Sequence, residues 1–440
     1  MGKKCCELGE CSTSYIYILL TNIFFFFKSS VLNLGELQIN TSINIFGIET
    51  VIKNHVLIKL LLEYVGYIIY GLIFLKIFNK KNIFKKEEEI LKSRTKSSNY
   101  LIFQEEDFNK NTVLPLLITC STFAVQLIIR SLLFFCNVWM FDLWIFNIIF
   151  ISIFMKKIFK KAIYKHQLYS LIFNFIVNLI LLITSSCIQT NGESDYDSIN
   201  RLYGSYLFVP LFYVVYLILA SLICYSQVSQ KKLMDFAYIS PFKILIVIGF
   251  FSSIFAFIAL IITSCVGCSG ALVENNFCQI SHPEFNNNTF YFDNFIVFLN
   301  NLGDKYNNDK VSFFLEIFLV YPLYSLACFM KYFFETMVVY LLNPNYVLIS
   351  DNMYYGTRYL IALINTPSDI KLYLNVFGDF FSLFLYFFYL EIFRFKCLGL
   401  DFNTRVSIKL RSKIEGILDN AEEEEEDNSS SSDVDRTDDI

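Results

Sequence analysis

The sequence predicts an all-α, polytopic membrane protein of about ten transmembrane helices, arranged as an inverted repeat of two five-helix halves. Three observations lead to this fold class. Of the 440 residues, 55% are hydrophobic and only 17% are charged. The apolar residues form blocks of about 18–25, which is long enough to cross a hydrocarbon core of roughly 30 Å. Lysine and arginine are concentrated in alternate connections between these blocks.

Each apolar block is expected to be a helix, because backbone groups inside lipid must hydrogen-bond to one another. The first block is the shortest, since it ends at Lys28. It either re-enters the membrane or continues past Lys28 with that side chain reaching outwards. No small-residue cleavage site follows it, so we expect a retained helix. The predicted spans are residues 12–27, 56–78, 113–135, 138–155, 167–188, 204–227, 242–266, 313–341, 346–364 and 376–395.

The basic residues predict that both termini, including the N-terminal segment 1–11, lie in the cytosol. With ten spans, 25 of the 36 lysine and arginine residues fall on the side of the termini and six on the opposite side. A bias of this kind is what the positive-inside rule describes. Glycosylation sequons at Asn40 and Asn287 fall in loops on the non-cytosolic side, where the modification is made.

The order of the loops predicts the internal repeat. In each set of five spans, the long connection follows the second span, as the basic cytosolic loop 79–112 and as the lumenal loop 267–312. The first half then covers residues 12–188 and the second covers residues 204–395. Because five is odd, the halves have opposite orientations, as in many secondary transporters. The acidic, serine-rich tail at 400–440 is expected to be disordered and cytosolic.

Ionisable residues inside the spans are the candidate site residues, because each costs roughly 2.5–3.5 kcal/mol near the bilayer centre on insertion scales. Asp351 and Arg358 in the ninth span are seven residues apart, which places them on one helix face about 10 Å apart. Arg130 in the third span and Asp142 in the fourth lie on consecutive helices. We expect these residues to line a cavity or to pair with one another.

Two further sets have the i, i+4 spacing of ion pairs on a helix. They are Lys331 with Glu335 in the eighth span and Lys59 with Glu63 in the second. Glu63 is also a candidate cavity residue, and Glu63, Asp142 and Asp351 are the candidates for proton coupling, because each is a carboxylate inside a span. The alternative for every such residue is a purely structural pair, or a side chain near a helix end that reaches water.

Cysteines mark two regions of the chain. Cys265, Cys268 and Cys278 cluster in the loop after the seventh span, where an oxidising lumen favours a disulfide; free thiols are the alternative. The Cys-x-x-Cys spacing does not predict a metal site, because two further ligands are lacking. Near the N-terminus, Cys5 and Cys6 are candidate lipidation sites.

Enzyme signatures are lacking in the sequence. It contains no phosphate-cradling glycine-rich loop, no His-Glu-x-x-His and no Gly-x-Ser-x-Gly motif. We therefore expect no enzyme activity, no catalytic residue and no cofactor. The expected partners are membrane lipid and a small-molecule solute, with a homodimer left open, and no nucleic acid.

Four local features carry a family resemblance. The first is the connection between the fourth and fifth spans, formed by residues 150–157 and a short basic turn through His166. The second is the connection between the sixth and seventh spans, formed by residues 230–234 and 239–242. The lumenal cysteines and the Asn343-Pro344-Asn345 turn are the other two. Together they resemble the drug/metabolite transporter superfamily, in the branch that contains the nucleotide-sugar and chloroquine-resistance transporters. The substrate motifs of the nucleotide-sugar branch are not matched.

This resemblance covers about residues 12–396 and implies a central cavity between the halves. Helix pairs three–four and eight–nine would close it alternately, and Asp142, Asp351 and Arg358 would line it. It also implies an endomembrane such as the vacuole or Golgi, with the plasma membrane as the alternative. We therefore expect a secondary transporter that moves a small polar or charged solute by alternating access. The competing hypothesis is a multi-pass scaffold or adaptor without transport activity.

Overall fold

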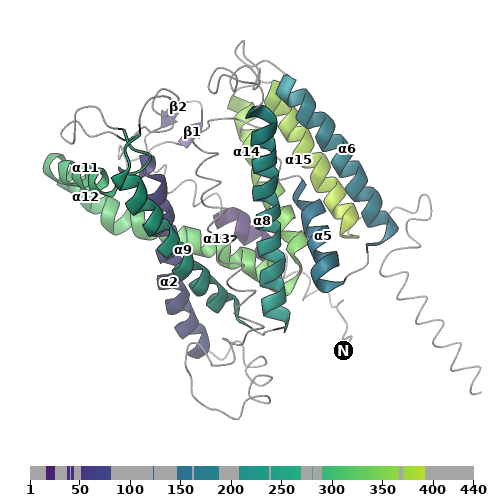
Figure 1. Ribbon diagram of the computed structural model, residues 1–440, viewed down its shortest axis with the longest axis horizontal. Helices are drawn as coiled ribbons and strands as arrows, with labels where there is room; N and C mark the ends of the chain where they lie inside the picture. Colours follow the sequence, from purple (N-terminus) through teal and green to yellow (C-terminus); the bar gives the residue numbers. More distant parts are fainter. Residues whose placement is uncertain are drawn as a thin grey trace, which may run out of the picture.

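The structure is a computed structural model in which helices make up nearly all of the described chain (Figure 1). It describes residues 16–24, 37–39, 41–43, 51–80, 122, 146–160, 163–187, 208–236, 239–268, 280, 290–365 and 370–391. A helix covers residues 16–24. The labelled elements are β1 (Leu37–Ile39), β2 (Thr41–Ile43), η1 (Val51–Asn54), α2 (Val56–Lys80), α5 (Asn147–Phe159), α6 (Lys165–Cys187), α8 (Phe208–Phe236), α9 (Pro241–Cys265), α11 (Phe295–Asn308), α12 (Lys310–Leu315), η4 (Glu316–Val320), α13 (Tyr321–Leu341), α14 (Pro344–Asn365) and α15 (Ile370–Tyr389).

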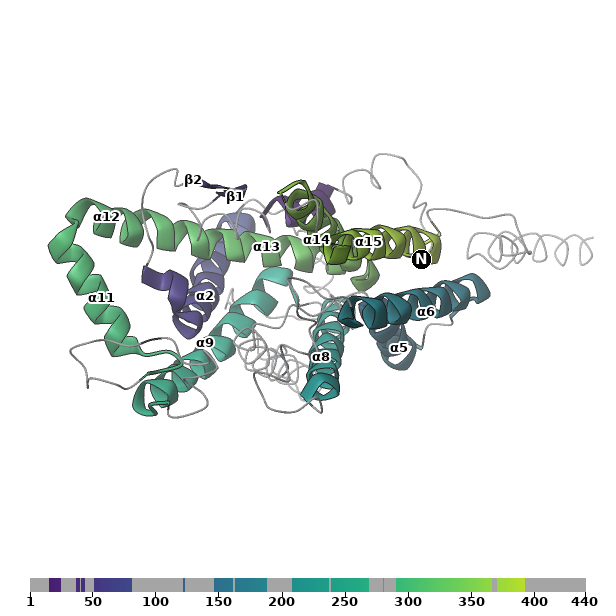
Figure 2. The ribbon, with the colours of Figure 1, turned by 90° about the horizontal axis from the view of Figure 1, so that it is seen from above.

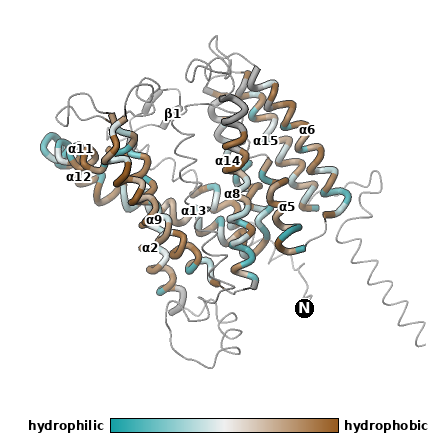
Figure 3. Tube along the Cα trace, in the orientation of Figure 1, coloured by the Kyte–Doolittle hydropathy of each residue, from teal (hydrophilic) through white to brown (hydrophobic). Residues whose placement is uncertain are grey.

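Four helical segments among the described residues are long and apolar enough to cross a membrane. They are Val56–Ile77, Pro241–Cys265, Lys310–Leu341 and Leu372–Tyr389. Helices α6 and α9 also turn large apolar side chains outwards, including Phe173 and Ile180 on α6 and Phe257 and Ile262 on α9. Figure 3 shows hydrophobic residues along the length of both helices. An outer surface of this kind suits lipid, so the helical membrane class predicted from the sequence is supported.

The helices form two groups joined by α13. One group contains α2, α9, α11 and α12, and the other contains α5, α6, α8, α14 and α15 (Figures 1 and 2). Helix α13 packs against α2 and α9 of the first group and against α8 and α14 of the second. Each group therefore combines helices from both predicted halves of the sequence.

Three helix pairs join equivalent spans of the two predicted halves. Helix α2 packs against α9, α5 against α14, and α6 against α15. In the predicted order of spans these are the second with the seventh, the fourth with the ninth and the fifth with the tenth. Helix α5 also packs against α8, and α14 packs against α15.

Glycines allow the closest of these contacts, between α2 and α9. A Cβ atom at Gly249 would lie 2.8 Å from the carbonyl oxygen of Tyr64 and 2.9 Å from the Cβ of Tyr67. A Cβ at Gly71 would lie 2.7 Å from Ile246 Cγ1. Small residues let helix backbones approach in this way, which is a main source of helix association in membranes.

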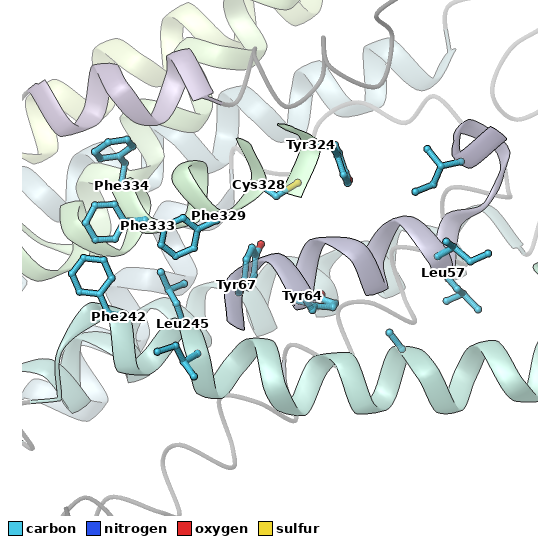
Figure 4. Packing of buried hydrophobic residues seen from close by; sticks show 14 of the residues in the cluster. Leu57, Tyr64, Tyr67, Phe242, Leu245, Tyr324, Cys328, Phe329, Phe333 and Phe334 are labelled. Atoms are coloured by element: carbon cyan, nitrogen blue, oxygen red, sulfur yellow. The ribbon is translucent and has the colours of Figure 1, made fainter. Parts of the chain in front are cut away.

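Aromatic side chains fill the largest buried cluster, between α2, α9 and α13. The rings of Phe242 and Phe333 stack with centroids 4.7 Å apart, and Phe329 lies 6.0 Å from Phe333. Figure 4 shows these rings between α9 and α13, with Tyr67 reaching from α2 towards the same space. Aromatic pairs of this kind add about 0.5–1.5 kcal/mol beyond their buried area.

The bounds of α5, α8 and α15 differ from the sequence prediction; α5 ends at Phe159 instead of residue 155. Helix α8 continues to Phe236 instead of ending at residue 227, because the expected loop lysine Lys231 is satisfied within the bundle. Its Nζ donates to the Tyr340 carbonyl of α13 at 2.7 Å and pairs with Asp235 at 3.1 Å. The tenth span, predicted at 376–395, is helix 370–389, which ends where Glu391 takes a left-handed conformation with φ 63°.

The predicted lumenal loop 267–312 contains helix α11 and the start of α12, which the sequence analysis did not predict. Asn294 caps α11 by accepting hydrogen bonds from the backbone N–H groups of Ile296 and Val297. Asp309 caps α12 through the N–H of Ser312. Helix η4 is a π-helical turn that joins α12 to α13 without a break. Three predicted segments lie outside the described residues: the third span apart from Thr122, the part of the loop 79–112 that follows α2, and the tail 400–440.

Candidate functional site

A charged cluster lies where α8, α13 and α14 meet. On α13, Lys331 is buried and its Nζ lies 2.5 Å from Glu335 Oε2, so the predicted i, i+4 pair is confirmed. Gln227 of α8 donates from Nε2 to Glu335 Oε1 at 3.1 Å. Asp351 of α14 is partly buried and interacts electrostatically with Lys331. We call these four residues, Gln227, Lys331, Glu335 and Asp351, the Lys331 site.

Helices α5 and α15 complete the surroundings of this site. Asp351 also lies near Cys224 of α8 and Tyr386 of α15. The thiol of Cys224 donates to the backbone carbonyl of Asn147 on α5 at 3.5 Å. Asn147 is 1% exposed. Five helices, from both predicted halves, therefore converge on one polar region inside the bundle.

Two amide oxygens of this region have no hydrogen-bond partner among the described residues. They are Oδ1 of Asn147 and Oε1 of Gln227, both in buried side chains. Buried polar atoms in native proteins are usually paired with protein, water or a ligand. These two acceptors can therefore bind a donor group of a solute or of water.

A second polar network ties α6 to α15 beside the Lys331 site. Asn178 Nδ2 donates to Ser382 Oγ at 3.2 Å, and Ser382 Oγ donates to Asn174 Oδ1 at 3.3 Å. Asn174 also hydrogen-bonds to Tyr386. Asn174, Asn178 and Ser382 are all buried. On the neighbouring helix α14, Asn352 donates to the Asp379 carbonyl of α15 at 3.4 Å.

The predicted residue Glu63 occupies a different place, in the aromatic cluster between α2 and α13. It is 4% exposed. The hydroxyl of Tyr67 donates to its Oε1 at 2.7 Å, and the hydroxyl of Tyr324 donates to its Oε2 at 3.5 Å. Glu63 thus does not share one site with Asp351, although both lie inside the bundle.

Two other buried carboxylates secure helix ends and were missed by the sequence analysis. Asp293 accepts from His55 Nδ1 at 2.7 Å and from the backbone N–H of Leu57 at 2.7 Å, at the start of α2. Glu316 accepts from Lys305 Nζ at 2.5 Å and from the hydroxyl of Tyr321 at 2.6 Å. These contacts join residues that are far apart in the sequence or lie in an unpredicted helix, so spacing along one helix could not reveal them.

Several predicted site residues fall outside the description. Arg130, Asp142, Cys278, Asn40, Asn287, Cys5 and Cys6 are not among the described residues, and only the backbone of Arg358 is described, on α14.

The cysteines of the lumenal region divide into two kinds. Cys268 is disulfide-bonded, as the sequence analysis allowed. Cys265 carries a free, exposed thiol, so its inclusion in the predicted disulfide is wrong. The physical reason is its position at the last residue of α9, where its side chain is exposed.

No protein-family model matches the chain, and no curated protein sequence matches it. The charges that the fold gathers inside its helices are therefore the features of this chain that bear on function.

Proposed function

We propose that this chain is a ten-helix secondary transporter with an inverted five-plus-five repeat, which moves a small polar or charged solute by alternating access. The observation that carries the proposal is the Lys331 site. Lys331, Glu335 and Asp351 lie on adjoining helices inside an apolar bundle, although ionisable groups there cost roughly 2.5–3.5 kcal/mol each on insertion scales. Such groups in membrane helices commonly mark a solute or ion pathway.

The helix contacts support the inverted repeat. A two-fold pseudosymmetry axis in the membrane plane brings equivalent helices of two inverted halves together. The contacts of α2 with α9, α5 with α14 and α6 with α15 are all of this kind. In transporters with inverted repeats, the solute site lies near the middle of the membrane between the halves. The four residues of the Lys331 site belong to the second predicted half, and Asn147 of α5, beside the site, belongs to the first, so the proposed solute site involves both.

The acceptors and charges of the site define what it would bind. Glu335 and Asp351 are carboxylates, and the free oxygens of Asn147 and Gln227 accept hydrogen bonds. Among the described residues of this site, Lys331 is the one that carries a positive charge. The site therefore suits a solute that carries hydrogen-bond donors. Both termini would lie in the cytosol of an endomembrane or plasma membrane, following the distribution of basic residues.

Uptake into vesicles that contain the purified full chain tests this proposal. A defined mixture of amino acids, sugars, organic acids and organic amines is offered, and each component is measured by mass spectrometry. We expect the wild type to move at least one component and Asp351→Asn to reduce that flux at least tenfold. Asp235→Asn is the matched control, because it also removes one carboxylate charge but lies exposed near the end of α8. Equal flux in wild type and Asp351→Asn would exclude the site.

One observation favours the alternative, a membrane scaffold or adaptor. Lys331 and Glu335 already form a closed pair at 2.5 Å with little exposure. Paired charges of this kind are satisfied without a solute. A wild-type chain that moves no component of the mixture, with gradients imposed in either direction, would reject transport and leave the scaffold as the proposed function.

A further inference from the structure

Glu63 is held as a buried carboxylate with hydroxyl donors on both oxygens. It lies within the apolar helix segment Val56–Ile77 and is 4% exposed. Tyr67, on the same helix, donates to Oε1, and Tyr324 of α13 donates to Oε2. An ionised carboxylate only accepts hydrogen bonds, whereas a protonated one must also donate. Binding of a proton by Glu63 therefore requires at least one of these two hydroxyls to rearrange, so that it can accept the new O–H.

A chain of contacts leads from Glu63 to the Lys331 site. The ring of Tyr67 lies 5.2 Å from the ring of Tyr332. The ammonium group of Lys331 lies 4.1 Å from the centre of that second ring. A cation over an aromatic face is attracted by the electrons of the ring, and this attraction is strongest where water is excluded. A movement of Tyr67 therefore acts on Lys331 through one intermediate ring.

Helix α13 carries both ends of this connection on one face. Tyr324, Cys328, Lys331 and Glu335 follow the spacing i, i+4, i+7 and i+11, which keeps them in one stripe along an α-helix. Tyr324 contacts Glu63 of α2, and Glu335 contacts Gln227 of α8. A rotation or shift of α13 therefore changes the surroundings of Glu63 and of the Lys331 site together.

We propose that Glu63 binds the proton that drives transport, and that its protonation state is passed to the Lys331 site through Tyr67 and Tyr332. This inference rests on the transport function proposed above. In each cycle a proton from water on one side forms an O–H bond with a Glu63 carboxylate oxygen. That bond breaks when the site opens to the other side, and the proton returns to water there. One proton crosses the membrane per cycle, and no other bond is made or broken.

The other titratable groups around Glu63 lie on the two helices that bind it. On α2 they are Lys59, one turn towards the N-terminus, with Tyr64 and Tyr67. On α13 they are Tyr324, Cys328 and Tyr332. Helix α9 packs against α2 but has ionisable residues only at its ends, Lys243 and Cys265. Among these groups Glu63 is the carboxylate, the kind of side chain that carries protons within the membrane helices of transporters.

The first test compares concentrative uptake with exchange in vesicles that contain the full chain, using the same defined mixture of solutes. With the membrane potential clamped, a gradient of one pH unit sustains about tenfold accumulation of a solute that moves with one proton. In Glu63→Gln we expect accumulation to fall to an inside-to-outside ratio of one, while exchange of the same solute across equal concentrations stays within about twofold of wild type. Accumulation by Glu63→Gln at the wild-type ratio would overturn the inference.

A second measurement does not need a transported solute. Infrared difference spectra of the purified full chain between two pH values report the carbonyl stretch of a protonated carboxyl group. We expect a pH-dependent band in wild type and in Asp235→Asn, and its loss in Glu63→Gln. If the wild type moves none of the solutes, the proposed function fails, and this band still decides whether Glu63 binds a proton. No difference between the spectra of wild type and Glu63→Gln would refute the proton site.

The connection from Tyr67 through Tyr332 to Lys331, which we call the relay, is tested separately by Tyr332→Leu. We expect this variant to keep the Glu63 band and to keep exchange, but to lose proton-driven accumulation, because the ring between Tyr67 and Lys331 is gone. Tyr67→Phe keeps the ring and removes one hydroxyl, so it should shift the pH midpoint of the band and retain accumulation. Unchanged accumulation in Tyr332→Leu would refute the relay. These two variants also keep the inference testable if Glu63→Gln does not fold.

Discussion

The close contact between α2 and α9 predicts, from geometry alone, that a larger residue at Gly249 lowers the stability of the protein. In Gly249→Ala the new Cβ would lie 2.8 Å from the Tyr64 carbonyl oxygen and 2.9 Å from the Tyr67 Cβ. Ordinary contacts between carbon atoms are about 3.5–4.0 Å. Both neighbours belong to, or lie directly on, the backbone of α2, so neither can turn aside as the end of a flexible side chain could. The two helices must therefore separate.

The expected cost follows from overpacking. Added methylene groups in a well-packed interior cost typically 1–3 kcal/mol. Replacing glycine by alanine inside a helix returns about 0.5–1 kcal/mol. The net destabilisation of Gly249→Ala should therefore be about 1–2 kcal/mol, and Gly249→Val should be worse. We would measure this by thermal unfolding of the purified full chain in detergent, followed by circular dichroism.

Gly303 is the matched control on α11. A Cβ there meets no atom within 4 Å, and the residue is exposed. Gly303→Ala gains helix propensity without a clash, so it should raise stability by about 0.5–1 kcal/mol. The two glycine substitutions are thus expected to have opposite signs. If Gly249→Ala proves as stable as Gly303→Ala, the close packing of α2 on α9 is refuted.

Two further predictions concern the buried ion pair and the cysteines. Lys331→Met should destabilise the chain by about 3–5 kcal/mol, because Glu335 is left as a buried charge without its partner. Combining Lys331→Met with Glu335→Gln should recover most of this loss. Unfolding free energies of the two single variants and the double variant are compared, and losses that simply add would contradict the pairing. A maleimide applied to the folded protein should label Cys265 directly and Cys268 only after reduction. Mass spectrometry of the labelled peptides distinguishes the two residues, and labelling of Cys268 without reductant would show that it is not in a disulfide.

Much of the local structure could be predicted because it depends on neighbours along the chain. Helices α6 and α14 lie within two residues of the predicted spans, since a polar backbone in lipid has few alternatives to a helix. The Lys331–Glu335 pair was also predictable, because residues four apart in the sequence meet on one face of a helix. The extension of α8 was missed because Lys231 is satisfied by a carbonyl on α13 rather than by water.

The membrane class and most of the helices follow from the sequence by itself, because lipid imposes length and apolarity on every span. Which helix faces meet is decided only by the tertiary structure. Tyr324 reaches Glu63 across 261 positions, and Asp293 reaches His55 across 238. Contacts at such separations depend on the packing of whole helices, in which small residues such as Gly249 set how closely two backbones approach. The spacing of residues on one helix contains no information about that packing.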